Sequence, residues 1–87
     1  MKFYLEQNYP NPFNPSTTIE YKIPDDSFVS LIVYDILGRE VKTLVNQQQK
    51  PGSYKVLMDG GSLASGTYFY RINYGNKIIS RKMLLIK

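Results

Sequence analysis

Apolar and polar residues alternate in two stretches of the chain, residues 17–23 and residues 53–59. An alternation with a period of two is typical of a strand that has one buried and one solvated face. The side chains that we expect to face inward are Ile19, Tyr21, Ile23, Tyr54, Val56 and Met58. Both stretches are therefore predicted to be strands of antiparallel sheets.

Residues 28–35 carry apolar side chains at odd and even positions alike, which predicts a strand in a central position. Further strands are predicted at residues 5–7, 40–46, 67–73 and 77–87. Glycine, proline and asparagine separate these stretches, and no long window shows the 3.6-residue period of a helix. The pattern predicts an all-β fold, an Ig-like antiparallel β-sandwich of about seven strands.

The segment between the first two predicted strands, residues 8–16, is rich in proline and asparagine. Proline fixes its own φ and disfavours helix at the residue before it. We expect a polyproline-like crossover that is packed onto the domain by its two large apolar residues, Tyr9 and Phe13. Residues 47–52 are predicted to be a polar loop, and residues 60–66 a wide turn.

A glycine followed by alternating tyrosines begins the late strand, at Gly66, Tyr68 and Tyr70. This arrangement is similar to the tyrosine corner of Ig-type domains, in which a tyrosine hydroxyl bonds the backbone a few residues upstream. It favours a sandwich over a barrel.

The length of 87 residues indicates one domain, residues 1–87, with a thin core and no room for a deep cleft. Met1 is interpreted as the start of an excised piece, and residues 1–4 as a linker or remnant beside the fold. The first residues lack the apolar core of a signal peptide. Apolar runs are far shorter than a membrane helix needs, so no stable membrane insertion is expected.

Histidine and cysteine are both absent from the sequence. Disulfides, Cys/His zinc sites, thiol nucleophiles and histidine-based acid–base catalysis are thereby excluded. We expect no enzyme activity, no catalytic residues, no cofactor and no metal. A weak calcium site at Asp25, Asp26 or Asp59 is the alternative to ordinary turn chemistry, which explains these carboxylates more simply.

The positive charge lies towards the end of the chain. Residues 1–59 hold all seven acidic residues and six of the eleven basic ones, whereas residues 60–87 hold five basic residues and no acidic one. Two interpretations stay open: solvated strands whose edges are protected by lysine, or a docking surface for an acidic partner.

Aromatic residues accompany the basic ones, at Tyr68, Tyr70, Arg71 and Tyr74. Two functional interpretations are possible: the rings could stack on the bases of single-stranded nucleic acid, or they could form an exposed aromatic row that binds glycans. Packing in the core is favoured over both, and we expect no nucleic-acid partner. The absence of tryptophan weakens the glycan reading further.

Residues 5–19, which read LEQNYPNPFNPSTTI, resemble the opening of type A C-terminal sorting domains, carried by cargo of the Por (type IX) secretion system of Bacteroidota and their relatives. Other segments fit the same family in register: residues 29–41 (VSLIVYDILGREV), 52–54 (GSY), 63–71 (LASGTYFYR), 81–83 (RKM) and Lys87. The resemblance spans nearly the whole chain. Two features depart from the family: Met58 stands where Trp or Phe is usual, and the turn at residues 59–63 is short.

The resemblance implies a sorting domain that follows a larger exported cargo and is recognised by outer-membrane secretion machinery. A sortase-like protease commonly removes such a domain, so the protein would pass through the periplasm to the cell surface or the medium. Family recognition is attributed largely to the last strands. The residues expected to bind the machinery are Gly66, Tyr68, Arg81, Lys82 and Lys87.

We expect the last predicted strand to present its basic side chains to an acidic receptor and to offer an edge for strand addition. Two other classes of function stay open. The chain could be an adhesive or carbohydrate-binding Ig-like module, or a structural assembly domain like that of flagellar hook-capping proteins.

Overall fold

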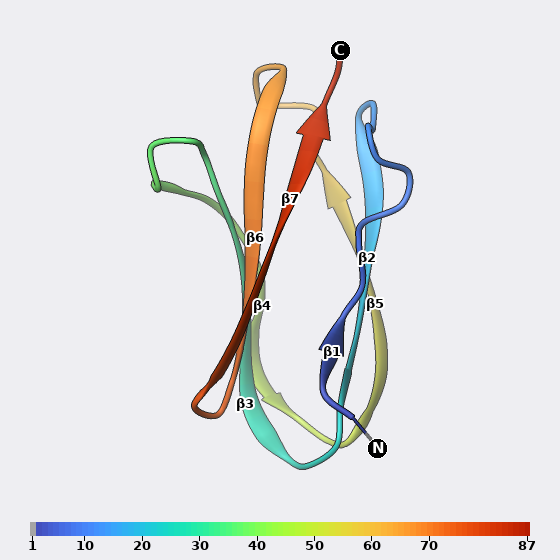
Figure 1. The fold of residues 1–87 in the computed structure, drawn as a ribbon, viewed down its shortest axis with the longest axis vertical. Helices are drawn as coiled ribbons and strands as arrows, with labels where there is room; N and C mark the ends of the chain where they lie inside the picture. The colour runs from blue at the N-terminus through green and yellow to red at the C-terminus, as the bar shows by residue number, and fades with distance from the viewer. Residues whose placement is uncertain (1) are drawn as a thin grey trace.

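The computed structural model describes residues 2–87, which form seven strands in two antiparallel sheets (Figure 1). The strands are β1 (Tyr4–Leu5), β2 (Ser16–Ile23), β3 (Ser27–Tyr34), β4 (Glu40–Gln49), β5 (Gly52–Asp59), β6 (Gly66–Tyr74) and β7 (Lys77–Leu85). One sheet has the order β1-β2-β5 and the other has the order β4-β3-β6-β7. The predicted all-β sandwich is confirmed.

The alternation along β2 places its apolar side chains in the space between the sheets. Ile19, Tyr21 and Ile23 are buried, while Glu20 between them is exposed. Strand β5 lies beside β2 with Ile19 opposite Val56, and Met58 is fully buried. The inward face predicted from the sequence is therefore the one observed.

Strand β3 is central, as its apolar pattern predicted, because it pairs with β4 on one side and β6 on the other. Val29, Leu31 and Val33 are fully buried between the sheets. The opposite face of β3 is partly open, and Phe28 on it is 54% exposed.

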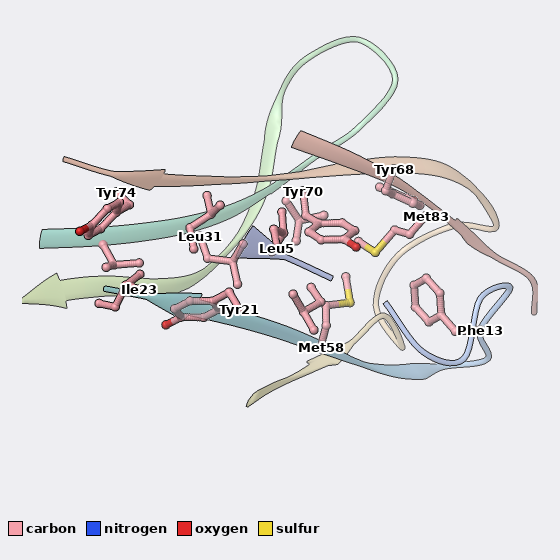
Figure 2. Packing of buried hydrophobic residues seen from close by; sticks show 14 of the residues in the cluster. Leu5, Phe13, Tyr21, Ile23, Leu31, Met58, Tyr68, Tyr70, Tyr74 and Met83 are labelled. Atoms are coloured by element: carbon pink, nitrogen blue, oxygen red, sulfur yellow. The ribbon is translucent and has the colours of Figure 1, made fainter. Parts of the chain in front are cut away.

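The core is a single layer of side chains that point toward one another from the two sheets (Figure 2). Phe13 closes one end of this layer from the proline-rich loop (Figure 2). The buried apolar residues are Leu5, Phe13, Ile19, Tyr21, Ile23, Val29, Leu31, Val33, Met58, Tyr68, Tyr70, Ile72, Tyr74, Met83 and Leu85. Two of the last three residues of β7 are thus part of the core.

The prediction of a polar loop at residues 47–52 was wrong for its first half, because β4 continues to Gln49. Gln49 is 8% exposed, and its side-chain oxygen accepts a hydrogen bond of 2.5 Å from the Tyr21 hydroxyl of the other sheet. A buried amide is tolerated when a partner satisfies it. That partner lies far away in sequence, so the local polarity of residues 47–49 gave the wrong expectation.

The expected crossover at residues 8–16 is instead a loop between neighbouring antiparallel strands of one sheet, β1 and β2. The backbone of Tyr9 in this loop pairs with that of Thr18 in β2, and the peptide bonds before Pro10, Pro12 and Pro15 are cis. The loop is packed down as predicted. Phe13 anchors it at 2% exposure, whereas Tyr9 is 80% exposed and was wrongly expected to be an anchor.

The tyrosine corner is confirmed. The hydroxyl of Tyr68 donates a hydrogen bond of 2.6 Å to the carbonyl oxygen of Ala64, four residues upstream. This bond ties the wide turn to the start of β6, in the manner typical of Ig-type sandwiches.

Candidate functional site

The five residues expected to bind the secretion machinery lie on β6, β7 and the residues that follow, but they do not form one patch. Gly66 and Tyr68 begin β6, opposite Leu85 and Met83 of β7. Gly66 has φ +154°, a value that L side chains rarely adopt, so a glycine suits the end of the turn. Tyr68 is only 7% exposed. Both residues therefore fix the backbone of the turn and the start of β6, and neither presents a side chain to a partner.

Lys87 is tied to the wide turn. Its Nζ donates a hydrogen bond of 2.6 Å to the carbonyl oxygen of Gly61, and its backbone N–H donates one of 3.0 Å to Oγ of Ser65. The residues after β7 therefore lie against the turn, and the Lys87 ammonium is held at the Gly61 carbonyl oxygen.

Arg81 and Lys82 point to opposite faces of β7, because successive side chains of a strand alternate. Arg81 faces the gap between the sheets, and its Nε donates a hydrogen bond of 2.5 Å to the carbonyl oxygen of Leu5 in β1. Lys82 lies opposite Phe69 and is exposed on the outer face of the four-stranded sheet. Of this pair, Lys82 presents its charge outward, and Arg81 closes the edge of the sandwich.

The outer edge of β7 is partly covered by the loop that follows β1. The backbone N–H of Phe13 donates to the carbonyl oxygen of Leu84, and the N–H of Ile86 donates to the carbonyl oxygen of Phe13, both at 3.0 Å. The side chain of Gln7 donates to the carbonyl oxygen of Lys82 at 2.8 Å. Strand addition along the whole of β7, as expected from sequence, is therefore blocked between Lys82 and Ile86.

The same loop is held from within the sandwich by Tyr70. The Tyr70 hydroxyl donates to the carbonyl oxygen of Glu6 and accepts from the backbone N–H of Asn8, each at 2.8 Å. Burial raises the pKa of this hydroxyl above its ordinary value. Residues 5–13 thus belong to the site at β7. Sequence reasoning did not place them there, although their density of asparagine, glutamine and proline was a signal of specific backbone contacts.

The basic side chains of residues 60–87 are free of ion pairs within residues 2–87, where the recorded pairs are Arg39 with Asp35 and Lys55 with Glu20. Arg71 packs over the ring of Tyr34 on the outer face of the four-stranded sheet, 4.9 Å from its centroid. Beside them lies a shallow hollow of about 220 Å³ that Phe69 also lines. This face can receive a partner surface with acidic and apolar groups.

The residues weighed as calcium ligands lie apart. Asp25 follows the end of β2 at Ile23, whereas Asp59 pairs with Ser16 at the opposite end of that strand. Asp25 accepts a hydrogen bond from the Tyr74 hydroxyl, and Asp59 accepts one from the N–H of Gly61. In the part of the chain that the structure describes, no group of three or more potential ligands comes together. Nor does any helix in residues 2–87 have the length and hydropathy to cross a bilayer.

The sequence matches the model of the secretion system C-terminal sorting domain family over residues 7–87. The chain belongs to this family. The family resemblance predicted from the motifs is thereby confirmed, and the domain is a C-terminal sorting signal for type IX secretion. A sorting domain implies an exported protein, a cargo that precedes it, and an interaction with the secretion system.

A search of curated proteins found no match. Among solved structures, the sorting domain is similar to part of PorZ, described as an essential bacterial surface component of the type IX secretion system of Porphyromonas gingivalis. The TM-score is 0.63 at 21% identity, over 98% of this chain and 11% of the PorZ chain. The sorting domain thus spans about a tenth of the length of that chain, and the likeness supports the sandwich fold.

Proposed function

We propose that the folded sorting domain docks on an acidic surface of the outer-membrane secretion machinery through β6, β7 and the loop packed on them. One observation carries the proposal: residues 60–87 hold five basic residues and no acidic one, and none of the five is in an ion pair within residues 2–87. Charge complementarity of this kind steers two proteins together and rejects wrong partners.

The signal is read in the folded state, because β7 is not a detachable tail. Met83 is 1% exposed and Leu85 is fully buried, so each would leave a gap in the core if the strand were extracted. Arg81 and Lys87 are likewise fixed by hydrogen bonds to Leu5 and Gly61.

The domain itself is non-enzymatic and serves its cargo as a label. The cargo passes through the periplasm with the domain attached and then reaches the cell surface or the medium. A sortase-like protease separates the two on the N-terminal side of Phe3, because Phe3 already packs against Tyr74 and Tyr4 pairs with Lys22 in the sheet. The tyrosines weighed as a glycan-stacking row, Tyr68, Tyr70 and Tyr74, face the core, which argues against carbohydrate binding at these residues.

A secretion assay tests the proposal in a bacterium with an intact type IX system. A periplasm-directed fluorescent reporter carries residues 1–87 at its C-terminus, unchanged or with Lys82→Glu and Lys87→Glu together. Deleting β7 would be uninformative because Met83 and Leu85 belong to the core. The matched control is Lys2→Glu with Lys50→Glu, which makes the same charge change at exposed positions that are outside β6 and β7 and in no ion pair within residues 2–87.

We expect the unchanged domain and the control to deliver the reporter to the medium or cell surface, and the Lys82/Lys87 variant to remain in the periplasm. Circular dichroism of the purified domains establishes that all three are folded. Equal export of both charge variants would refute the basic docking surface. Retention of the reporter with the unchanged domain would count against the sorting role in that host.

A further inference from the structure

A groove lies on the outer face of β7, where the loop after β1 meets the four-stranded sheet. It has a volume of about 340 Å³ and is lined by Asn11, Pro12, Thr67, Lys82, Met83 and Leu84. One wall comes from the opening segment of the chain, and the other comes from its last two strands. The groove therefore exists only when both ends of the chain are in place.

The loop wall is held at a fixed position by hydrogen bonds to β7. The backbone N–H of Leu84 donates to Oδ1 of Asn11 at 3.0 Å, and the carbonyl oxygen of Leu84 accepts from the N–H of Phe13 at 3.0 Å. Phe13 in turn is anchored in the core at 2% exposure. A wall supported by buried packing is preorganised, which lowers the entropic cost of binding.

The lining combines one positive charge with apolar surface. Lys82 is the only charged residue among the six, and no carboxylate of residues 2–87 pairs with it. Its carbonyl oxygen is bound by Gln7, while its ammonium makes no recorded hydrogen bond. Leu84 is 38% exposed beside Pro12. The groove thus offers a cation next to an aliphatic surface.

A second hollow of about 330 Å³ adjoins Lys82 on its other side and is lined by Phe69, Ser80, Arg81 and Lys82. Lys82 therefore stands between two depressions, both free of acidic residues. The opposite sheet differs: the hollow on its outer face contains Glu6 and Glu20 together with Lys55, so acidic residues outnumber the basic one there.

We propose that the groove receives an extended acidic segment of the secretion machinery, with a carboxylate at Lys82 and an aliphatic side chain against Pro12 and Leu84. This inference rests on the proposed docking function and gives it a location. The occupant is acidic because the groove and its surroundings are basic, and it carries an apolar side chain because Leu84 and Pro12 are otherwise left in water. The first and last segments of the sorting domain act as one recognition site.

The reporter assay tests the groove with two variants and two matched controls. Thr67→Glu adds a carboxylate to the groove beside Lys82, and Thr18→Glu makes the same change at a half-buried strand position in the other sheet. Leu84→Ser removes the apolar contact, and Leu57→Ser removes an exposed leucine, 69% exposed, from the other sheet. Thermal unfolding of each purified domain accompanies the assay.

We expect Thr67→Glu and Leu84→Ser to lower export of the reporter by about tenfold each, and both controls to export it like the unchanged domain. If Thr67→Glu does not fold, Leu84→Ser against Leu57→Ser decides the question, because both leucines are exposed. Normal export of the reporter by the Leu84→Ser domain overturns the proposal that the groove is the binding site, while the broader docking proposal remains. Failure of the unchanged domain to export the reporter overturns both.

Discussion

The backbone N–H of Phe13 donates a hydrogen bond of 3.0 Å to the carbonyl oxygen of Leu84, and so joins the opening loop to the last strand. The next backbone bond, from Ile86 back to Phe13, continues the ladder, and the Phe13 ring enters the end of the core. The loop therefore covers an edge that would otherwise expose unpaired backbone groups to other chains. It leaves the outer side chains of β7 available to a partner.

Phe13→Ala should destabilise the domain by about 3–5 kcal/mol, because it leaves a cavity under the loop and removes the anchor of the β7 edge. Urea denaturation of the purified domain measures this loss. Tyr9→Ala, in the same loop at 80% exposure, is the control and should change the free energy of unfolding by less than about 0.5 kcal/mol. Equal stability of the two variants would show that Phe13 does not hold the loop.

Tyr70→Phe should cost about 1–3 kcal/mol, since it leaves the Glu6 carbonyl and the Asn8 N–H without their partner in a partly buried site. Tyr34→Phe removes a hydroxyl that has no recorded hydrogen bond, and it should leave stability within about 0.5 kcal/mol of the unchanged domain. Chemical denaturation at pH 7 compares the two. If Tyr70→Phe left the free energy of unfolding unchanged, water would replace the hydroxyl at no cost.

Much of the fold could be predicted from local pattern, because burial imposes a period of two on strands that are half exposed. Ile19, Tyr21 and Ile23 indicate one inner face, and apolar residues at both odd and even positions of β3 indicate a central strand. The tyrosine corner was also predictable from the sequence, since its hydrogen bond joins Tyr68 to Ala64, only four residues away. Features whose causes lie within a few residues are open to this kind of reasoning.

Features that depend on a distant partner were not predictable. Gln49 has the sequence context of a loop, and only the Tyr21 hydroxyl on the facing sheet makes its strand position favourable. Arg81 has the sequence context of a docking cation, yet its guanidinium binds the carbonyl oxygen of Leu5. In both cases the polar character of the residue was clear from the sequence. Its hydrogen-bond partner was not, because that partner comes from another part of the chain.

Gly60→Ala should destabilise the domain by about 1–3 kcal/mol, because a Cβ there would lie 3.2 Å from Leu85, from the Phe13 ring and from the carbonyl oxygen of Pro15. The Pro15 oxygen cannot move freely, since it accepts the hydrogen bond of the Gly60 N–H itself at 2.8 Å. Denaturant midpoints measure the effect.

Gly61→Ala is the control for this substitution. Its nearest neighbour would be the Asp59 carboxylate, a flexible side chain on the surface, so we expect a cost below about 1 kcal/mol. If Gly61→Ala were as damaging as Gly60→Ala, backbone conformation rather than the close approach of Phe13 and Leu85 would be the cause.

The stability of the domain should fall in alkaline solution because of its buried tyrosines. Burial raises the pKa of Tyr21 and of Tyr70 in the folded state. The unfolded chain loses these protons near pH 10, about the ordinary value for tyrosine, while the folded chain still holds them. This contribution to the free energy of unfolding is therefore fully present below about pH 10 and is lost as pH rises through the raised values.

Denaturation of the double variant Tyr21→Phe, Tyr70→Phe between pH 9 and 11, in steps of about half a unit, checks this origin. The variant should be less stable than the unchanged domain at pH 7, because two hydrogen-bonding hydroxyls are gone, but its stability should decline less steeply above pH 10. Leu57→Ser, which changes no ionisable group, should keep the full slope. Parallel slopes for the double variant and the unchanged domain would assign the alkaline loss to groups other than these two tyrosines, and would leave Tyr21 and Tyr70 with a structural role alone.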